Sequence, residues 1–519
     1  MSTNLTLTLS AISNLDPAPT YKRSNGSAPD DIQRPLATFG QRTALVGLAL
    51  YVAFAPHSVA ASVIGVSIAG IGWVLKAIST GGLGLRRSRF DLIILLSLVW
   101  TVASSVFSEE PRISLLKLES LWCVFLFYLA RAIITKRSAL GLVLILILSG
   151  SVGAIYSAFD LTRGRGVVVQ SLMPGSPFHN VGIQPGDTIW RIGHSRVYST
   201  AEIDELLKTM PAERPVVVSI ISQGENVERP GLTITPGQRG LTSPSGVVGD
   251  GRSHRFRASG WTRHYVTFAE MLQMIAQLAL GLALAHLRNH GFNKYSRLAV
   301  GATAILALGV VFTAMRTVLV AFALGATLIA WRALRGAYKV AFTFAVFFVL
   351  AFGAVVVWQT RAPDALLLGD ASSSLRAQVA RVGLSRILVH PVFGHGMDAM
   401  KLHWNEWGFP GSDMIHLHST PLQLAFDRGL PMLALWLWMV VAFWIYIARA
   451  ERSARDLSDT NSYGLLLGIL GALTGFLASS LVNYNYGDAE ATMMFWFLMG
   501  LAMVLARREA SNSPEIQAI

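Results

Sequence analysis

Two histidines and two arginines are the side chains of this chain best suited to proton transfer and anion binding. His416 and His418 stand one residue apart in IHLHSTPLQLAFDRGL, and Arg316 interrupts the apolar run VVFTAMRTVLVAF. Arg376 lies in SSSLRAQVARVGLSRILVHPVFGHG. A neutral imidazole accepts a proton from a hydroxyl, and a guanidinium is a permanently charged, planar donor that suits phosphate oxygens. Together these residue types predict a site that holds an anion and moves a proton.

The residues after His418 predict the start of a helix. Thr420-Pro-Leu-Gln423 has the pattern of a capping box with Pro421 at the first helical position, and Gly429 fits just past the helix end. The positive end of a helix dipole disfavours an imidazolium ion, so His418 is expected to be neutral, as a general base must be. The same helix terminus suits an anion.

A metal site is the alternative interpretation of the two histidines. The H-x-H spacing does not put both rings on one helix face, which would need i, i+4 spacing. His395 and His403 are candidate extra ligands that nothing in the sequence brings close. No metal and no cofactor are therefore expected. A plain role as polar histidines of a surface loop stays open.

Arg316 is expected at a membrane surface rather than at the bilayer centre, where an arginine costs ~2.5–3.5 kcal/mol on insertion scales. The apolar pattern places it where the seventh span turns into the eighth, on the extracytoplasmic side. It either lines a polar cavity there or snorkels to the lipid headgroups.

A short interfacial helix is predicted to carry Arg376. Serines 372–374 suggest its N-cap, and Leu375, Val379 and Val382 form an apolar stripe that ends near Gly383. Arg376 and Arg381 lie off this stripe, whereas Arg386 would fall back onto it. All three arginines either contact headgroups or contribute one or two anion ligands.

The composition predicts the scaffold that holds these residues. Only 14% of the 519 residues are charged, against about 25% in soluble domains, and several apolar runs reach spanning length. We therefore expect an all-α polytopic membrane protein of about twelve transmembrane helices. They are expected near 43–57, 59–78, 91–108, 115–134, 139–160, 265–287, 297–315, 317–334, 340–359, 429–448, 463–483 and 489–506.

The basic residues predict the orientation of these helices. With both termini cytoplasmic, six basic clusters fall on the cytoplasmic side, as the positive-inside rule requires. They lie at 86–89, 136–137, 288–297, 332–339, 449–455 and 507–508. This accounts for the net charge of +13, so nucleic acid is not an expected partner. The expected organisation is a disordered cytoplasmic tail (1–40), helices 1–5 (41–160), an extracytoplasmic insert (161–264), helices 6–9 (265–359), a large extracytoplasmic loop (360–428), helices 10–12 (429–508) and a cytoplasmic tail (509–519).

The insert between the fifth and sixth helices contains a small α+β domain. GVVVQSL (166–172) and RPVVVSIIS (214–222) predict strands, and a capping box at Ser199–Glu202 opens a helix. The order GSP, then GI-x-PGD-x-I, then this helix resembles a bacterial PDZ domain over residues 166–235. Such domains bind an extended peptide at a strand edge; a structural spacer that has kept only the fold is the alternative.

A basic segment, residues 251–264, follows this domain. It carries Arg252, Arg255, Arg257 and Arg263. They either contact anionic headgroups or attract an anionic glycan or a lipid-linked diphosphate.

The sequence lacks the motifs expected of two other kinds of membrane protein, an intramembrane metalloprotease and a transporter with internal repeats. An intramembrane metalloprotease needs H-E-x-x-H, which does not occur, and no internal repeat of the transporter kind is evident. A PDZ-bearing membrane scaffold, or a transporter of envelope biogenesis without catalysis, remains the alternative to an enzyme.

The order TAMRTVLVAF, SLRAQVARVGLSRILVHPVFGHG and HLHSTPLQLAFDRGLPMLAL resembles the O-antigen ligase and polymerase superfamily, most closely over residues 297–450. The resemblance implies metal-independent glycan transfer at the periplasmic face of the bacterial inner membrane. The donor would be a glycan on undecaprenyl diphosphate. The acceptor would be lipid A–core in a ligase, a lipid-linked repeat unit in a polymerase of surface polysaccharide, or a protein.

The resemblance also implies residue roles. Arg316, Arg376 and His418 would be the catalytic residues. Apart from the resemblance, position and charge make His416, Arg381, Arg386 and Arg263 candidates to contact substrate. Two features depart from the family pattern. Ser419 stands where many relatives have Asn, and the PDZ-like insert, an unusual addition, suggests coupling to an envelope protein partner such as a chain-length regulator.

Overall fold

The computed structural model describes residues 33–507, apart from segments 361–370 and 412–415 and the single residues 212, 223, 250, 263 and 458. The predicted tail 509–519, most of the tail 1–40, and Arg263 lie outside the described residues. The boundary of the first tail is wrong, because helix α2 (Gln33–Phe54) already includes residues 33–40. Pro35 does not prevent this, because the first turn of a helix has no use for its missing N–H.

Eleven helices of the described part are long and apolar enough to cross a membrane, in agreement with a polytopic membrane protein. Ten of them are α2, α3 (Val59–Thr80), α4 (Arg89–Phe107), α7 (Lys136–Arg163), α10 (Tyr265–His290), α11 (Lys294–Phe312), α12 (Arg316–Ala333), α13 (Ala337–Thr360), α16 (Thr420–Asp456) and α17 (Thr460–Ser480). The twelfth predicted span is the shorter apolar helix α18 (Ala489–Leu505).

The eleventh candidate span is not one regular helix. The predicted span 115–134 consists of α5 (Pro111–Leu116), the 3₁₀ segment η1 (Lys117–Val124) and α6 (Phe125–Ile133). Irregular backbone at membrane depth is tolerated where it lines a cavity. Lys117 and Ser120 to Val124 do line the cavity described below.

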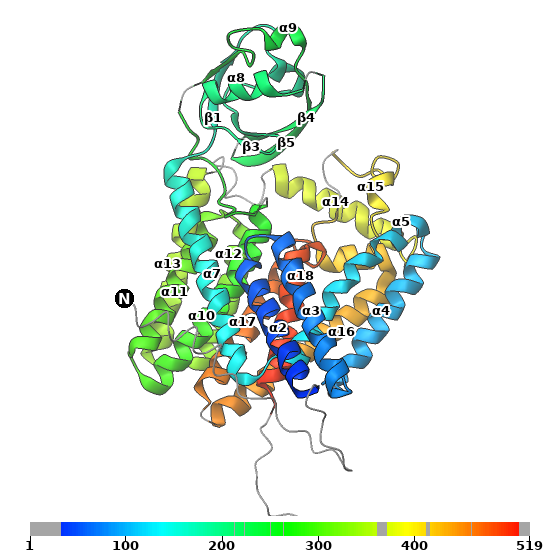
Figure 1. Cartoon of the computed structure of the whole chain (residues 1–519), viewed down its shortest axis with the longest axis vertical. Helices are drawn as coiled ribbons and strands as arrows, with labels where there is room; N and C mark the ends of the chain where they lie inside the picture. The colour runs from blue at the N-terminus through cyan, green and yellow to red at the C-terminus, as the bar shows by residue number, and fades with distance from the viewer. Residues whose placement is uncertain are drawn as a thin grey trace, which may run out of the picture.

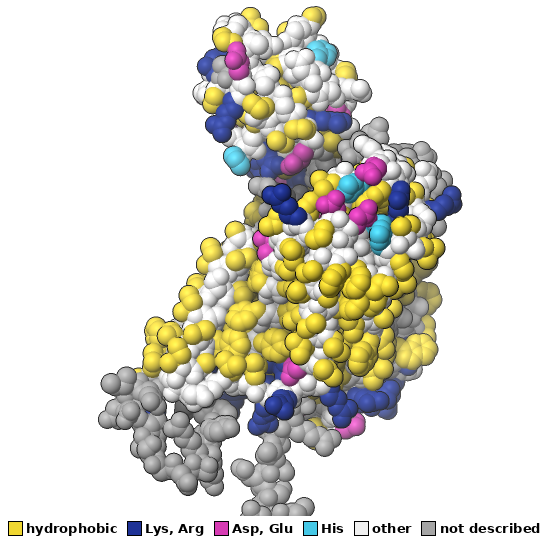
Figure 2. Space-filling view, turned by 90° about the vertical axis from the view of Figure 1, so that its right-hand side faces the viewer, with side chains coloured by type: hydrophobic (Ala, Val, Ile, Leu, Met, Phe, Trp, Pro, Cys, Tyr) yellow, Lys and Arg dark blue, Asp and Glu magenta, His cyan; other side chains and the backbone are white. Residues whose placement is uncertain are grey.

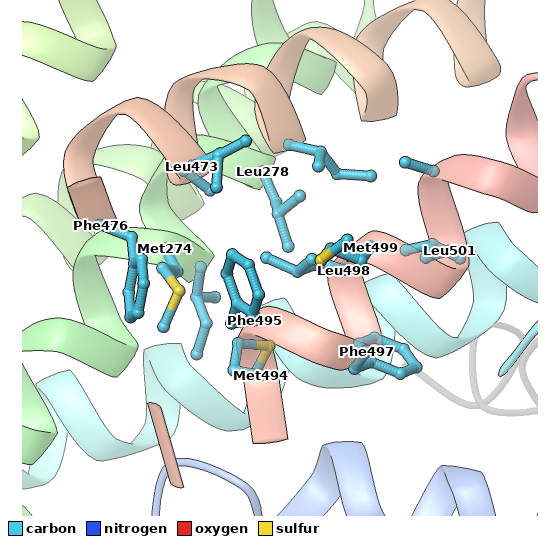
Figure 3. Close-up of a cluster of buried hydrophobic side chains, with 14 of the residues drawn as sticks. Met274, Leu278, Leu473, Phe476, Met494, Phe495, Phe497, Leu498, Met499 and Leu501 are labelled. Atoms are coloured by element: carbon cyan, nitrogen blue, oxygen red, sulfur yellow. The ribbon is translucent and has the colours of Figure 1, made fainter. Parts of the chain in front are cut away.

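The centre of the helical part is α10, whose apolar window is completely buried. It packs closely on α17: a Cβ atom added to Gly281 would lie 2.4 Å from the Gly464 oxygen, so only glycine permits this approach. Figure 3 shows Met274 and Leu278 of α10 in one apolar cluster with Leu473 of α17 and Phe495 of α18.

One face of the helical part is mainly apolar between two edges that carry charged side chains (Figure 2). Figure 2 shows an apolar belt, with Lys and Arg side chains gathered along the edge farthest from the sheet domain. Some of the basic clusters lie in connections between helices, for example Arg86 between α3 and α4 and Arg335 between α12 and α13. Histidine and acidic side chains, together with further Lys and Arg side chains, appear at the opposite edge (Figure 2).

A sheet domain stands on the end of α7 (Figure 1). Its strands are β1 (Val167–Leu172), β2 (Thr188–Ile192), β3 (Ser195–Arg196), β4 (Val216–Ser222), β5 (Glu225–Leu232) and β6 (Val247–Gly249), with the short helices η2 (Pro177–Val181), α8 (Thr200–Thr209) and α9 (Pro236–Arg239). The six-stranded antiparallel sheet has the order β5-β4-β2-β1-β6, with β3 paired to β2.

The predicted strands 166–172 and 214–222 and the helix capped by Ser199 are confirmed as β1, β4 and α8. Ile203 and Leu207 of α8 are fully buried against the sheet. Strand β6 lies beyond residue 235, so the domain is longer than the predicted range 166–235.

Candidate functional site

A cavity of about 620 Å³ lies at the sheet-domain end of the helices. Among the described residues, the basic or imidazole side chains that line it are Lys117, His264, Arg376, Lys401, His416, His418 and Arg428, and the acidic ones are Glu270, Asp398, Asp427 and Asp488. Asp398 is paired with Lys117 at 3.0 Å and with Lys401 at 2.9 Å. The structure thus brings three of the predicted site residues, Arg376, His416 and His418, to one cavity.

The two histidines face each other at the cavity wall. Their ring centroids are 4.1 Å apart, and the backbone N–H of His418 donates to Nδ1 of His416 at 3.2 Å. His418 has φ 52°, a left-handed conformation that is uncommon outside glycine and that concentrates at functional sites. Within the described part of the chain, its buried Nε2 has no hydrogen-bond partner. That nitrogen is available to a ligand.

Both rings are neutral at pH 7. Burial, followed by the charges of His416 and Arg376, lowers the pKa of His418 to about 3. Burial, followed by Arg376, His264 and Lys401, lowers the pKa of His416 to about 4. The expected neutrality of His418 therefore has desolvation as its main cause, rather than the helix dipole.

The predicted capping box at the start of α16 is wrong in detail. Ser419 is the N-cap residue and makes no side-chain cap in the described structure. Gln423 instead accepts the N–H of Leu417 at 2.7 Å, and buried Thr420 donates to the Asn483 carbonyl. The local Leu417–Gln423 bond and the Thr420 contact with a distant loop take the place of the cap and hold the residues on both sides of His418.

The HPVFGHG segment and the RGL turn are joined to each other. Three backbone hydrogen bonds link them: His395 N–H to Phe426 O (2.8 Å), Gly396 N–H to Asp427 O (3.0 Å) and Leu430 N–H to Pro391 O (2.8 Å). At Gly429 the helix breaks, with φ 80° and ψ 170°, as its predicted role past a helix end requires. A Cβ atom there would lie 1.8 Å from the Val392 oxygen, so the junction needs glycine.

Arg376 is positioned by α14 (Ala371–Ile387), which is longer than predicted. Its serines 372–374 lie inside the first turn instead of capping it, and it continues past Gly383 because Ile387 is buried in the cluster around Leu417. Arg376 is half-buried and reaches the cavity.

Arg381 and Arg386 have other surroundings. Arg381 is exposed, and the Arg386 guanidinium lies 5.8 Å from the Trp407 ring centroid. Of the described arginines, neither of these two lines the cavity.

Arg316 begins α12, at the junction predicted for it, but it is not among the described residues that line the cavity. Hydrogen bonds of Asn483 connect the start of α12 to the residues that follow His418. Thr317, the neighbour of Arg316, is bonded to Asn483 Nδ2 at 3.1 Å, and the Asn483 carbonyl accepts from Thr420. The starts of α12 and α16 are therefore tied to the same asparagine.

Several lining residues were missed by sequence reasoning. Glu270 is fully buried in α10 and accepts from Asn483, and Tyr484 and Tyr486 follow that asparagine in the loop before α18. A glutamate within an apolar span, and the NYNY stretch between two spans, are the sequence signals that point to them.

His395 and His403, the other candidate metal ligands, have carboxylate partners away from His418. His395 Nδ1 is 2.5 Å from Glu109, and His403 lies between Glu110 and Glu406. Among the described residues, Glu109, His390 and His395 bring ligand atoms within 4.8 Å of one another. None of these three lines the cavity.

The fold and site together define a polytopic membrane protein with a polar, imidazole-lined cavity at one end of its helices. Residues 301–437 match the family model described as O-antigen ligase, which supports the resemblance to the O-antigen ligase superfamily. The match contains Arg316, Arg376, His416 and His418. This supports an O-antigen ligase- or polymerase-type membrane glycan transferase.

A second similarity is to the magnetosome formation protease MamE of Magnetospirillum gryphiswaldense. The two are 30% identical over 66 residues, which is 13% of this chain and 8% of that protein. The chain thus spans less than a tenth of the length of this curated relative.

Proposed function

We propose that this protein moves a glycan from a lipid-linked diphosphate, of the undecaprenyl diphosphate kind, to an acceptor hydroxyl at the sheet-domain side of the membrane. The observation that carries the proposal is His418 Nε2, a buried and neutral nitrogen in the same cavity as Arg376. Both residues lie within the segment that matches O-antigen ligase.

The reaction is a displacement at the anomeric carbon. The acceptor oxygen forms the new bond to this carbon, and the bond from carbon to the diphosphate oxygen breaks, with its electron pair leaving on the diphosphate. His418 Nε2 takes the proton of the acceptor hydroxyl. Arg376, aided by Arg316 at the start of α12, stabilises the negative charge that develops on the leaving group.

The low pKa of His418 fits this sequence of events. A ring with a pKa of about 3 stays neutral but is a weak base. A bound diphosphate adds negative charge beside it, which raises its pKa towards the working pH. The donor thereby activates its own base.

A groove in the apolar surface suits the polyprenyl tail of the donor. It measures about 630 Å³ and is lined by Val63, Val66, Ser67, Gly70, Ile71, Val74, Leu75, Trp122 and Phe125. Trp122 also lines the polar cavity. A lipid tail in the groove would therefore meet its diphosphate headgroup beside Trp122.

The proposed location is the bacterial inner membrane, with both termini cytoplasmic and the cavity on the periplasmic face. The gathering of Lys and Arg at the edge opposite the cavity supports this orientation (Figure 2). The sheet domain, which we propose to be PDZ-like, would stand in the periplasm. A pulldown with the full chain and with a variant lacking the domain would test whether it captures an envelope protein.

The decisive experiment is glycan transfer by the purified protein in liposomes that contain a lipid-linked oligosaccharide. We expect His418→Ala and Arg376→Ala to abolish transfer, whereas Arg381→Ala, on the exposed side of the same helix, keeps it. Normal transfer by His418→Ala would refute the assigned base. Correct insertion of the wild-type chain without transfer to any acceptor would favour the scaffold or transporter alternative.

A further inference from the structure

We propose that Arg257 and Tyr265 form an anion subsite at the rim of the cavity, for the phosphate groups of the donor, and that Glu225 of the sheet domain occupies it in the donor-free protein. The subsite rests on the proposed function for the identity of its ligand. Its anion chemistry is testable without transfer.

The subsite is built around a buried cation. The Arg257 side chain is only 4% exposed, and its guanidinium lies 4.2 Å from the centroid of the Tyr265 ring. Nη2 of Arg257 forms an ion pair with Oε1 of Glu225, and the Tyr265 hydroxyl donates to Oε2 at 3.1 Å. Each oxygen of one carboxylate thus has its own donor, an arrangement that two phosphate oxygens can also adopt.

The position of this group connects it to the proposed reaction. Tyr265 and the preceding His264 line the same cavity as Arg376 and the two histidines. On its other side, Nη1 of Arg257 lies 3.7 Å from the sulfur of Met315, the residue just before Arg316. Arg257 therefore stands between the cavity rim and the start of α12.

Glu225 comes from a different part of the fold than its two partners. It is the first residue of β5, the edge strand of the sheet, directly after the β4–β5 turn. In Figure 1 this strand lies along the lower side of the sheet domain, facing the helices. The domain has separate attachments to α7, including Arg196 to the Tyr156 hydroxyl at 3.1 Å and Arg163 over Tyr198. Release of Glu225 leaves those attachments in place.

The solvent exposure of Glu225 and the burial of Arg257 favour replacement of the Glu225 carboxylate by a diphosphate. The Glu225 side chain is 35% exposed, so it regains water readily on release, whereas a buried guanidinium needs an anionic partner. A diphosphate carries more negative charge than one carboxylate and so replaces Glu225 favourably. Donor binding would therefore free the β4–β5 edge of the domain, which couples the domain to occupation of the cavity.

The test measures inorganic pyrophosphate binding to the full chain in detergent, by calorimetry, and the donor KM in liposomes. Glu225→Gln keeps the shape but removes the competing charge, so pyrophosphate should bind several-fold tighter and the donor KM should fall. Arg257→Gln should weaken pyrophosphate binding at least tenfold, and Tyr265→Phe should weaken it less. The matched control is Glu228→Gln, because Glu228 lies on the same strand and pairs with Arg191 inside the sheet domain.

The outcomes separate this inference from the proposed function. Unchanged or weaker pyrophosphate binding by Glu225→Gln would make Glu225 a structural clamp only, and wild-type binding by Arg257→Gln would eliminate the subsite. Tyr265→Phe, which removes a single hydroxyl, keeps the test valid if an Arg257 variant fails to fold. Pyrophosphate binding can also be measured on His418→Ala, because this binding does not require transfer. The expected binding pattern in a protein that transfers no glycan would uphold the subsite and reject the proposed reaction.

Discussion

The backbone N–H of His418 donates to Nδ1 of His416. Since Nδ1 accepts, the neutral His416 ring carries its proton on Nε2. The bond also closes a tight turn that holds His418 at φ 52°. His416 is therefore a positioning residue, and His418, whose Nε2 is buried without a partner among the described residues, is the proposed base.

Substitutions of His416 should separate positioning from proton transfer. His416→Asn keeps a side-chain acceptor near the His418 N–H, whereas His416→Phe keeps only the ring. We expect modest loss of kcat in the first and a larger loss in the second, against a loss of about 100- to 10,000-fold for His418→Ala. Steady-state transfer rates with saturating donor give the comparison. Equal losses in His416→Phe and His416→Asn would contradict the positioning role.

The stability of the protein should decline on acidification because of the two histidines. Burial lowers the pKa of His418 from 6.5 to about 3, so between these values the unfolded chain binds a proton that the folded protein does not. The free energy of unfolding therefore falls as the pH falls from about 6.5 towards about 3. We expect a shallower decline in His418→Asn, measured by thermal unfolding at pH 7 and pH 5. His179→Asn, an exposed histidine of the sheet domain, is the control and should keep the wild-type slope.

Gly429→Ala should uncouple the HPVFGHG segment from α16. The added methyl group would lie 1.8 Å from the Val392 oxygen, at a residue with φ 80°. Backbone strain of this kind alone costs about 1–3 kcal/mol, and the clash adds to it. We expect a lower Tm and loss of transfer. Gly301→Ala, a helical glycine of α11 with open space around it, should leave both unchanged; a Gly429→Ala protein as stable as wild type would show that the junction tolerates a side chain.

Filling the apolar groove should impair long-chain donors selectively. Ser67 is exposed and lines the groove, so Ser67→Trp places a ring where the polyprenyl tail is proposed to lie. The donor KM should rise several-fold for a full-length polyprenyl chain and much less for a short one. Ile64→Trp, a lipid-exposed position of the same helix that is not among the groove residues, is the matched control. Equal effects of both substitutions on KM would argue that the tail binds elsewhere.

Local patterns in the sequence determined much of this fold. Apolar runs placed the spans, since bilayer thickness sets their length. Short apolar runs marked β1 and β4, a serine cap marked α8, and Gly429 marked the helix break before the long part of α16. The motif order also indicated that Arg376, His416 and His418 belong to one functional segment, and the structure brings them to one cavity.

Contacts between distant segments were decided only by the tertiary structure. Asn483 joins the starts of α12 and α16, and Glu225 of the sheet domain pairs with Arg257. Arg257 looked like one of several surface arginines, yet it is buried. Periodicity and capping signals report on residues a few positions apart. Which polar groups meet across the fold depends on how the helices pack, because each buried group must find its partner wherever that packing brings one.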